Sequence, residues 1–234
     1  MNINKHLILL FSVLFFLFAV SVSSGCFRKN ESDVKSVVRN ELDQLKNLDS
    51  ETTQKYIPYT ELFPDATENT DLTDEINKTF SLFFRKFNYK ISDVIVGTAN
   101  HSATVSVKLT TIDSKVLARD FKAELLRTQI TESAQAQKGN IKDSSRSLEA
   151  HYLILNHLLN TNDYDTAETD CNIQLVNTGN DKKEKWKIQR TNSLEDDLVG
   201  GLIADLADPD ILSPEDTLTV YLDTLQKLDL KEMT

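Results

Sequence analysis

The chain has 234 residues, of which 40% are hydrophobic, and carries 26 Lys and Arg against 36 Asp and Glu, for a formal charge of −10. An acidic chain of this kind lacks the electrostatic footprint of a nucleic-acid-binding protein, so we expect no nucleic-acid partner. Eleven of the acidic residues lie within 192–234 together with two lysines. We interpret this acidic end as a solvated helical surface.

The first 25 residues have the pattern of a secretory signal peptide. Lys5 precedes an apolar run over residues 7–20 that only Ser12 interrupts, as in the charged and hydrophobic regions of such signals. The run is shorter than the roughly 20 residues that span a bilayer core, so a permanent membrane helix is the less favoured alternative. We therefore expect export, which leaves 209 residues for the mature protein.

Small residues and a cysteine follow, as Ser-Val-Ser-Ser-Gly-Cys over residues 21–26. This segment resembles the lipobox of bacterial lipoproteins, with Ser23 where that family usually has an aliphatic residue. The resemblance implies that Cys26 receives a diacylglyceryl group with palmitate-like chains and becomes the new N-terminus. Two acyl chains hold a protein stably, at about 0.8 kcal/mol per buried CH₂. We therefore expect a lipid anchor to the extracytoplasmic face of the cell membrane, with residues 26–30 as a short tether.

The cysteine count agrees with lipidation, since the chain has only Cys26 and Cys171. A lipidated Cys26 leaves Cys171 without a disulfide partner. The alternative is a Cys26–Cys171 bridge after cleavage further upstream. Cys171 alternates with polar neighbours, so we interpret it as a small buried apolar residue of a strand.

Helices are predicted over the next part of the chain. Apolar residues recur at helical spacing over 32–49, and the opposite face is charged, which predicts an amphipathic helix. A Pro-containing stretch over 57–65 follows. Thr73 is then an expected N-cap, with Asp74 and Glu75 favourably placed in the first turn. The stripe that follows predicts core rather than a ligand site and consists of Ile76, Phe80, Phe83, Phe84 and Phe87.

The period of the apolar residues then changes to two, as in a half-buried strand. Strands at 91–96 and 103–109, around a turn at 98–101, predict an antiparallel hairpin. Two helices are predicted after it, at 114–137 and 144–160, separated by Lys-Gly-Asn at 138–140 as a helix stop.

A second hairpin is predicted from the alternating strand at 167–175, a turn at 177–180 and a return strand that contains Trp186 and Ile188. Strands with one polar and one apolar face form an antiparallel sheet that is covered on one side. The helices are expected to supply that cover.

Three short patterns mark the region after the second hairpin. Ser-Leu-Glu-Asp at 193–196 has the spacing of a capping box and predicts a short helix. Gly200-Gly201 within it lacks the spacing of a phosphate-binding loop, so we expect close packing or a kink there. Asp-Pro-Asp at 208–210 supplies too few oxygen ligands at loop spacing to predict a calcium site, and we expect no metal and no cofactor.

A last helix is predicted over 213–234, with Ser213 as its cap and Pro214 at its first position. Residues 218–231 match 38–51 at a constant offset of 180, with five identities in fourteen positions and the apolar face kept. This match suggests the start of a truncated second repeat. The alternative is that any amphipathic helix gives such a match. A lone helix would need a partner surface to bury Leu218, Leu222 and Leu225.

The order of these elements resembles a group of bacterial lipoproteins of unknown function, and Lys-Trp-Lys-Ile at 185–188 and Val-Gly-Gly-Leu at 199–202 carry the resemblance. It implies a cystatin-like domain over 31–207, related to nuclear transport factor 2. The expected fold is therefore α+β. A curved antiparallel sheet of about four strands, in two hairpins, packs against helices, with the helical pair as an insertion.

Three functions are open. The favoured one is a non-catalytic binding module that presents a pocket or surface to a protein or small ligand, since fold alone does not give function. The second is a structural or assembly component that docks onto an envelope protein. The third is an enzyme that uses a cone-shaped cavity, but the mature histidines His101, His151 and His157 form no recognisable catalytic spacing. We name no catalytic residue, and Cys26 is the only functional site predicted.

Overall fold

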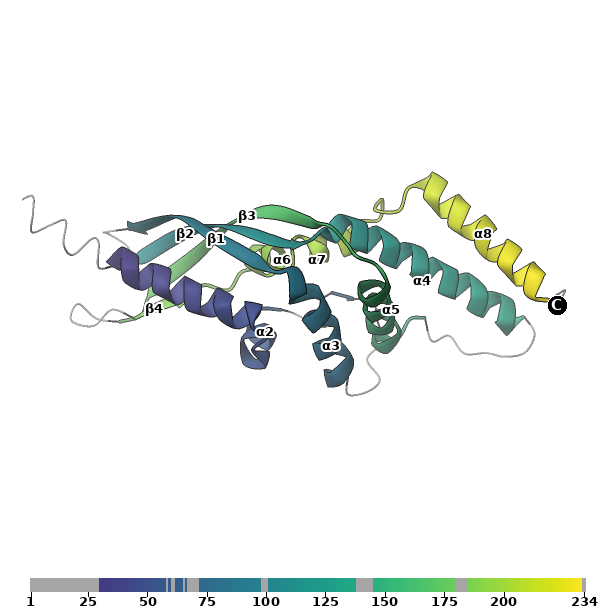
Figure 1. Ribbon diagram of the computed structural model, residues 1–234, viewed down its shortest axis with the longest axis horizontal. Helices are drawn as coiled ribbons and strands as arrows, with labels where there is room; N and C mark the ends of the chain where they lie inside the picture. The colour runs from purple at the N-terminus through teal and green to yellow at the C-terminus, as the bar shows by residue number, and fades with distance from the viewer. Residues whose placement is uncertain are drawn as a thin grey trace, which may run out of the picture. The chain divides into compact units, whose positions relative to one another are not determined.

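The protein is an α+β protein with one four-stranded antiparallel sheet, in the strand order β1-β2-β3-β4 (Figure 1). The computed structural model describes residues 30–57, 59, 62–64, 66, 72–97, 101–137, 145–179 and 185–232. The predicted signal peptide, Cys26, residues 98–100 of the first predicted turn and residue 180 of the second lie outside these ranges. No helix of the described ranges combines the length and the apolar character needed to cross a membrane.

Both predicted hairpins are confirmed, and each is longer than predicted in at least one strand. In the second hairpin, Leu175 pairs with Ile188 and Asn177 with Trp186. The chain reverses direction near His101, whose φ of 47° is left-handed. The strands are β1 (Asn88–Gly97), β2 (Ser102–Ile112), β3 (Thr166–Asn177) and β4 (Trp186–Ile188).

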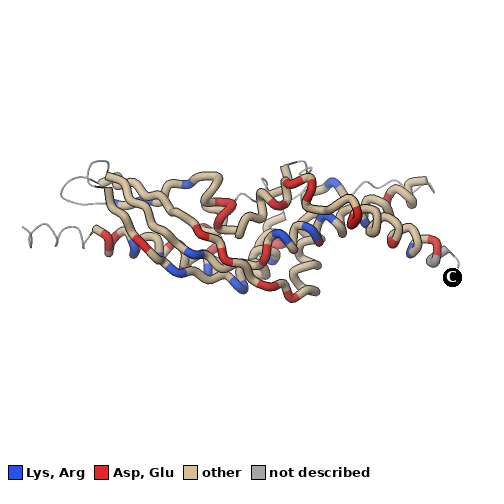
Figure 2. Tube along the Cα trace, turned by 90° about the horizontal axis from the view of Figure 1, so that it is seen from above, with Lys and Arg blue, Asp and Glu red and all other residues tan. Residues whose placement is uncertain are grey.

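One face of the sheet is polar, as the alternation of the sequence predicted. Ser106 Oγ donates a hydrogen bond to Asn172 Oδ1 at 2.8 Å. Further along the strands, Lys108 Nζ lies 3.1 Å from Asp170 Oδ1 and 3.5 Å from Glu168 Oε2. Figure 2 shows basic and acidic residues interspersed along the described chain. Opposite charges on neighbouring strands stabilise a sheet modestly and leave this face compatible with water.

The chain divides into two compact units, which we describe separately. The described part of the first unit contains residues 30–40, Ile91–Val107 and Asn172–Gln189. Its core is the apolar face of the strands together with one face of the helix at 30–40. The buried side chains of this core are Val34, Val38, Ala103, Val105, Val107, Ile173, Leu175 and Trp186.

The second unit contains Glu41–Lys90, Lys108–Cys171 and the residues from Arg190 onward. The predicted first helix, residues 30–46, continues into it and ends before Leu48, whose φ is 61°. A short helix that the sequence analysis missed follows as α2 (Ser50–Tyr56). Asp49 caps it, because its carboxylate accepts from the backbone N–H of Thr52 at 2.9 Å.

The next helix, α3 (Thr73–Phe83), continues into a 3₁₀ turn, η1 (Phe84–Lys86). The predicted cap is wrong by one residue, since Leu72 holds the cap position and Thr73 is already helical. The aromatic stripe is confirmed as core. Phe80, Phe83, Phe84 and Phe87 are each at most 3% exposed.

The predicted helical pair is present as α4 (Ser114–Ala136) and α5 (Leu148–Thr161). The second helix starts later than the predicted residue 144, and Ser147 supplies its cap by accepting from Ala150 N at 3.1 Å. Helix α5 packs against α3. There Asn156 Nδ2 donates to Thr79 Oγ1 at 3.2 Å, and both side chains are buried.

Two short helices follow the sheet, α6 (Asn192–Leu198) and α7 (Leu202–Ala207). The predicted capping box at Ser193 is wrong: Thr191 caps α6 by accepting from Leu194 N, and Glu195 pairs with Arg190. Gly200 and Gly201, with φ of 67° and 90°, separate the two helices. The predicted kink is therefore a complete helix break.

The last helix, α8 (Pro214–Glu232), begins as predicted, with Ser213 Oγ accepting from Asp216 N at 3.1 Å. It packs along α4 (Figure 1). The buried residues of its described side chains are Val220 and Thr224, each 6% exposed. Leu218 and Leu222, which were expected to need a partner surface, are 57% and 55% exposed.

Candidate functional site

A cavity of about 500 Å³ lies within the second unit. This volume is within the range of about 300–1,000 Å³ that small-molecule sites have. Residues of four segments line it: the 62–66 segment, α4, the start of α5 with the two residues 145 and 146, and α7. The apolar lining residues are Leu62, Phe63, Pro64, Ala66, Phe121, Leu125, Ile203, Leu206 and Ala207. The polar ones are Lys122, Gln129, Ser145, Arg146 and His151.

His151 and Ser145 are the buried polar residues of this lining, at 8% and 2% exposure. The ring centroid of His151 lies 4.8 Å from that of Phe63 and 5.6 Å from that of Phe121. Phe63 and Phe121 also stack on each other at 5.1 Å. The three rings form one aromatic wall, and aromatic contacts of this kind orient a side chain.

Burial lowers the pKa of His151 below its ordinary value of 6.5, and the positive charge of Lys122 lowers it further. The imidazole is therefore neutral at pH 7. Its buried Nδ1 has no hydrogen-bond partner among the described residues. An N–H group that is buried without an acceptor costs more free energy than an unprotonated ring nitrogen in the same place. The favoured tautomer therefore carries its proton on Nε2, and Nε2 is the hydrogen-bond donor of the ring.

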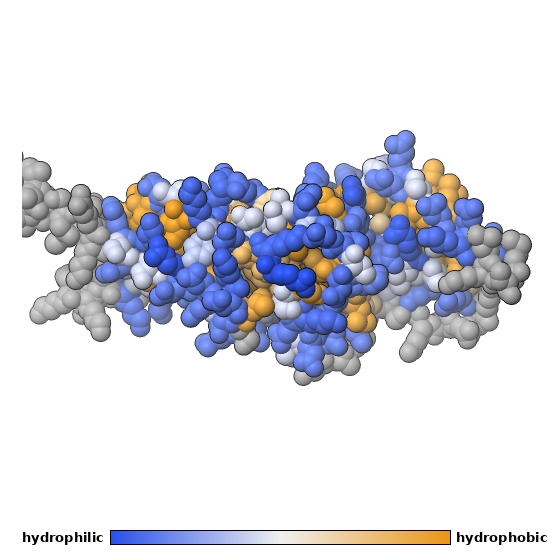
Figure 3. Space-filling model, viewed as in Figure 1, coloured by the Kyte–Doolittle hydropathy of each residue, from blue (hydrophilic) through white to orange (hydrophobic). Residues whose placement is uncertain are grey.

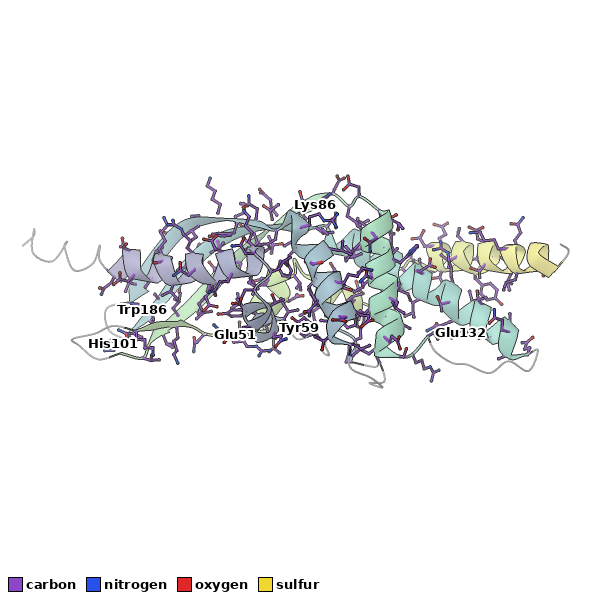
Figure 4. The ribbon with its side chains drawn as sticks, turned by 60° about the horizontal axis from the view of Figure 1, so that its bottom comes forward. Glu51, Tyr59, Lys86, His101, Glu132 and Trp186 are labelled. Atoms are coloured by element: carbon purple, nitrogen blue, oxygen red, sulfur yellow. The ribbon has the colours of Figure 1, made fainter. Side chains whose placement is uncertain are left out.

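The charges of the lining have one sign. Lys122 and Arg146 are its charged residues, and no described carboxylate belongs to it. Glu132 on α4 (Figure 4) approaches a lining residue, because its Oε2 accepts a hydrogen bond from the backbone N–H of Ser145 at 3.2 Å. Lys122 forms no hydrogen bond or ion pair with any residue that the structure describes. The site thus offers positive charge and donors beside apolar walls.

The structure brings none of the other residues considered from the sequence into this cavity. His101 lies in the first hairpin turn, at the same end of the sheet as Trp186 (Figure 4). His157 is exposed on α5. Cys171 is a buried free thiol in β3, as interpreted from the sequence, and burial followed by the nearby Asp197 raises its pKa.

No metal site emerges from the described side chains, in which no three His, Cys, Asp or Glu residues gather around one point. In the Asp208–Asp210 turn, Asp208 Oδ1 accepts a hydrogen bond from the backbone N–H of Asp210 at 2.9 Å, so this carboxylate oxygen has a partner within the turn. Cys26, the predicted lipidation site, lies outside the described residues.

Sequence reasoning missed the cavity because its lining comes from segments up to 145 residues apart, from Leu62 to Ala207. Lys122 and Arg146 have no motif spacing, and each resembles an ordinary helix-surface cation. The one available signal was His151, which directly precedes the apolar run of residues 152–155 in the predicted helix. A titratable ring on a helix face that packs inward is a candidate site residue.

No family model matches the sequence, and the comparisons with curated proteins and with solved structures likewise give no match. The fold and the cavity therefore define the class, an α+β protein with a small-molecule-sized site, on the evidence of this chain alone.

Proposed function

We propose that this protein is a membrane-anchored extracytoplasmic lipoprotein that binds a small molecule without transforming it. The single observation that carries the binding role is the cavity of about 500 Å³. Its walls are apolar and aromatic, and its polar lining residues are Lys122, Gln129, Ser145, Arg146 and His151. Natural small-molecule sites have this composition.

The proposed anchor is a diacylglyceryl group on Cys26, and its support is the lipobox resemblance at 21–26. The buried free thiol of Cys171 is consistent with that assignment, since this cysteine then needs no partner. The proposed domain is cystatin-like. Its support is the four-stranded antiparallel sheet, formed by two hairpins with helices between them.

We propose binding rather than catalysis because of what surrounds His151. Its nearest ring neighbours are Phe63 and Phe121. A general base needs a partner that orients it and a nucleophile or substrate proton within hydrogen-bond reach. No described carboxylate or hydroxyl hydrogen-bonds the imidazole. This environment suits a residue that contacts a ligand better than one that transfers a proton.

Native mass spectrometry of the full chain, released from detergent micelles, tests the binding role. We expect a reproducible added mass that differs from that of the detergent and of the acyl group. Ala207→Trp should abolish it, because Ala207 lines the cavity from an exposed position and an indole there fills space. Ala204→Trp is the matched control, since Ala204 is exposed on the same helix but is not a lining residue. An added mass that survives Ala207→Trp would contradict the proposal.

Growth with an alkyne-tagged fatty acid tests the anchor. We expect the wild type and Cys171→Ser to incorporate the tag and to sediment with membranes. Cys26→Ser should lose both properties, since two acyl chains are what makes such an anchor durable. A tag that remains on Cys26→Ser would refute lipidation at this residue.

A second candidate function is an assembly component of the cell envelope, and one observation favours it. Leu218, Tyr221 and Leu222 of α8 are 57%, 46% and 55% exposed, on a face that α4 does not cover. Figure 3 shows hydrophobic side chains gathered over this helix. Large apolar side chains that cluster on a surface mark an interaction site.

Charge indicates the kind of partner that fits this apolar face. At 100° per residue, Glu215 and Asp229 lie within about 60° of Leu218 around the helix axis, one before and one after the apolar residues. An amphipathic segment of an envelope protein whose apolar side is flanked by basic residues would complement the acidic residue at each end of this apolar face. A second copy of α8 would instead place carboxylates against carboxylates.

A leucine-lysine model helix, titrated by fluorescence anisotropy, probes this candidate. We expect it to bind the wild type and to lose at least tenfold in affinity with Leu218→Asp. A leucine-glutamate helix should not bind. Val220→Asp is the control for damage to the fold, because Val220 is buried against α4 and its change should lower stability instead. Equal binding of the two model helices would remove this candidate.

A further inference from the structure

We propose that the cavity selects an organic anion, namely a compact apolar molecule that ends in one carboxylate. This inference rests on the proposed binding function and names the chemistry of its ligand. Three observations carry it: the apolar walls, the single sign of the lining charges, and the orientation of His151.

The walls define the body of the ligand. Phe63 and Phe121 form a stacked aromatic wall, and Ile203 and Leu206 contribute aliphatic surface from α7. Burial of an apolar body against such surface contributes about 25 cal/mol per Å². A flat ring or a short alkyl chain fits beside the two phenyl rings, whereas a highly hydroxylated molecule would leave its hydroxyl groups without partners.

The charges define the head group. Lys122 and Arg146 are the charged residues of the described lining, and Lys122 forms no hydrogen bond or ion pair with a described residue. Lys122 follows Phe121 in α4, and both side chains line the cavity. An unpaired ammonium beside a partly dry cavity attracts an anion, and a charge-assisted hydrogen bond to a carboxylate is about twice as strong as a neutral one.

His151 supplies a donor next to this cation. Its buried Nδ1 is without a partner among the described atoms, which leaves the proton on Nε2 as the favoured tautomer. A neutral imidazole N–H donates to a carboxylate oxygen but gains nothing from an ammonium head group. Lys122 and His151 line the same cavity, so one head group can approach both.

Isothermal titration calorimetry with three ligands of identical body tests the selection. The ligands are 4-phenylbutyrate, 4-phenylbutanol and 4-phenylbutylamine, which end in an anion, a neutral hydroxyl and a cation. The protein is the full chain in phosphatidylcholine nanodiscs, with empty nanodiscs as the blank. We expect phenylbutyrate to bind at least tenfold more tightly than phenylbutanol, and phenylbutylamine to bind most weakly.

Two variants assign the selection to its residue. Lys122→Gln should reduce the affinity for phenylbutyrate about tenfold and leave that for phenylbutanol unchanged. Lys115→Gln is the matched control, because it removes the same charge from an exposed position of α4 outside the lining. Both substitutions are at positions that are not buried, so the fold should tolerate them.

The outcomes separate the two proposals. If phenylbutanol or phenylbutylamine binds as tightly as phenylbutyrate, and Ala207→Trp abolishes that binding, the cavity is a binding site but the selection for an acid is refuted. If none of the three binds and native mass spectrometry shows no added mass, the proposed binding function fails as well. A further outcome is that Lys115→Gln weakens the binding of phenylbutyrate as much as Lys122→Gln does. In that outcome the summed charge of the helix, and not Lys122 itself, attracts the anion, and the assignment to Lys122 is overturned.

Discussion

Gly200 lies directly against the side chain of Thr111, which is 1% exposed in β2. A Cβ at position 200 would clash with Thr111 Oγ1 and lie 3.1 Å from Thr111 Cβ. The φ of 67° at this residue adds the strain of a left-handed conformation. We expect Gly200→Ala to lower the free energy of unfolding by about 3 kcal/mol, measured by urea denaturation.

Gly201→Ala is the matched control for this prediction. Gly201 also has a positive φ, of 90°, but the nearest atom to its added Cβ is Ser114 Oγ at 3.7 Å, an ordinary contact. Only the backbone strain remains, and we expect a loss of about 1 kcal/mol. Equal losses at the two glycines would mean that the contact with Thr111 contributes nothing.

Tyr152 and Tyr56, two buried tyrosines of the second unit, should respond in opposite ways to loss of the hydroxyl. Tyr152 donates to the backbone carbonyl of Tyr59 at 2.7 Å, so Tyr152→Phe should cost about 1 kcal/mol. The buried hydroxyl of Tyr56 has no partner in the described ranges, since Lys55 hydrogen-bonds Glu41 instead. Tyr56→Phe should therefore be neutral or stabilising by up to about 1 kcal/mol. Thermal unfolding of both variants checks the prediction, and a destabilised Tyr56→Phe would contradict it.

His151 should make the stability of the second unit depend on pH. Burial and the charge of Lys122 lower its folded-state pKa below 6.5, the value expected for the unfolded chain. As the pH falls below about 6.5, the unfolded chain binds a proton that the folded chain does not. The stability present above this pH is therefore lost progressively as the pH falls toward the folded pKa.

The measurement is the difference in free energy of unfolding between pH 7.5 and pH 5. We expect His151→Gln to reduce this difference. His157→Gln removes an exposed imidazole of the same helix and should leave it unchanged. The overall stability of His151→Gln is not the readout, because a buried amide has its own cost. If the two variants had the same pH dependence, the buried imidazole would not be its source.

The sheet could be predicted because its signal is local. A period of two over 103–109 and 167–175, with turn residues between the strands, specifies which face of each strand is buried. Val105 and Ile173 are accordingly 0% and 1% exposed. A shift of one residue would turn every one of these side chains to water, so the pattern determines the register strongly.

The helix ends could not be predicted as well, because several residues compete for each cap. Thr191, Asn192 and Ser193 are all good cap residues, and the choice of Thr191 depends on where the chain leaves β4 and on the pairing of Arg190 with Glu195. Helix α2 was missed for a related reason. Its seven residues have too little periodicity to predict, and the Asp49 cap defines it.

The face of α8 shows what a repeat in the sequence leaves open. Leu42 and Leu45 of the first helix are 2% and 1% exposed, whereas their counterparts at an offset of 180 were expected to need a partner surface. Leu222 is 55% exposed, and the buried residues of α8, which packs against α4, are Val220 and Thr224. Helical periodicity gives an amphipathic face, but the surface that covers it depends on tertiary contacts.

The number of free thiols in the denatured chain distinguishes the three states of Cys26. Lipidation blocks Cys26 and leaves one thiol, that of Cys171, whereas a Cys26–Cys171 bridge leaves none and an unmodified chain leaves two. We expect one thiol per chain in denaturant without reductant, measured with Ellman's reagent on protein purified from membranes. In the native state we expect that thiol to react slowly, because Cys171 is 2% exposed and burial raises its pKa. Its reaction rate should then follow the opening of the fold, and Gly200→Ala should react faster than Gly201→Ala, by about tenfold for each 1.4 kcal/mol of additional destabilisation.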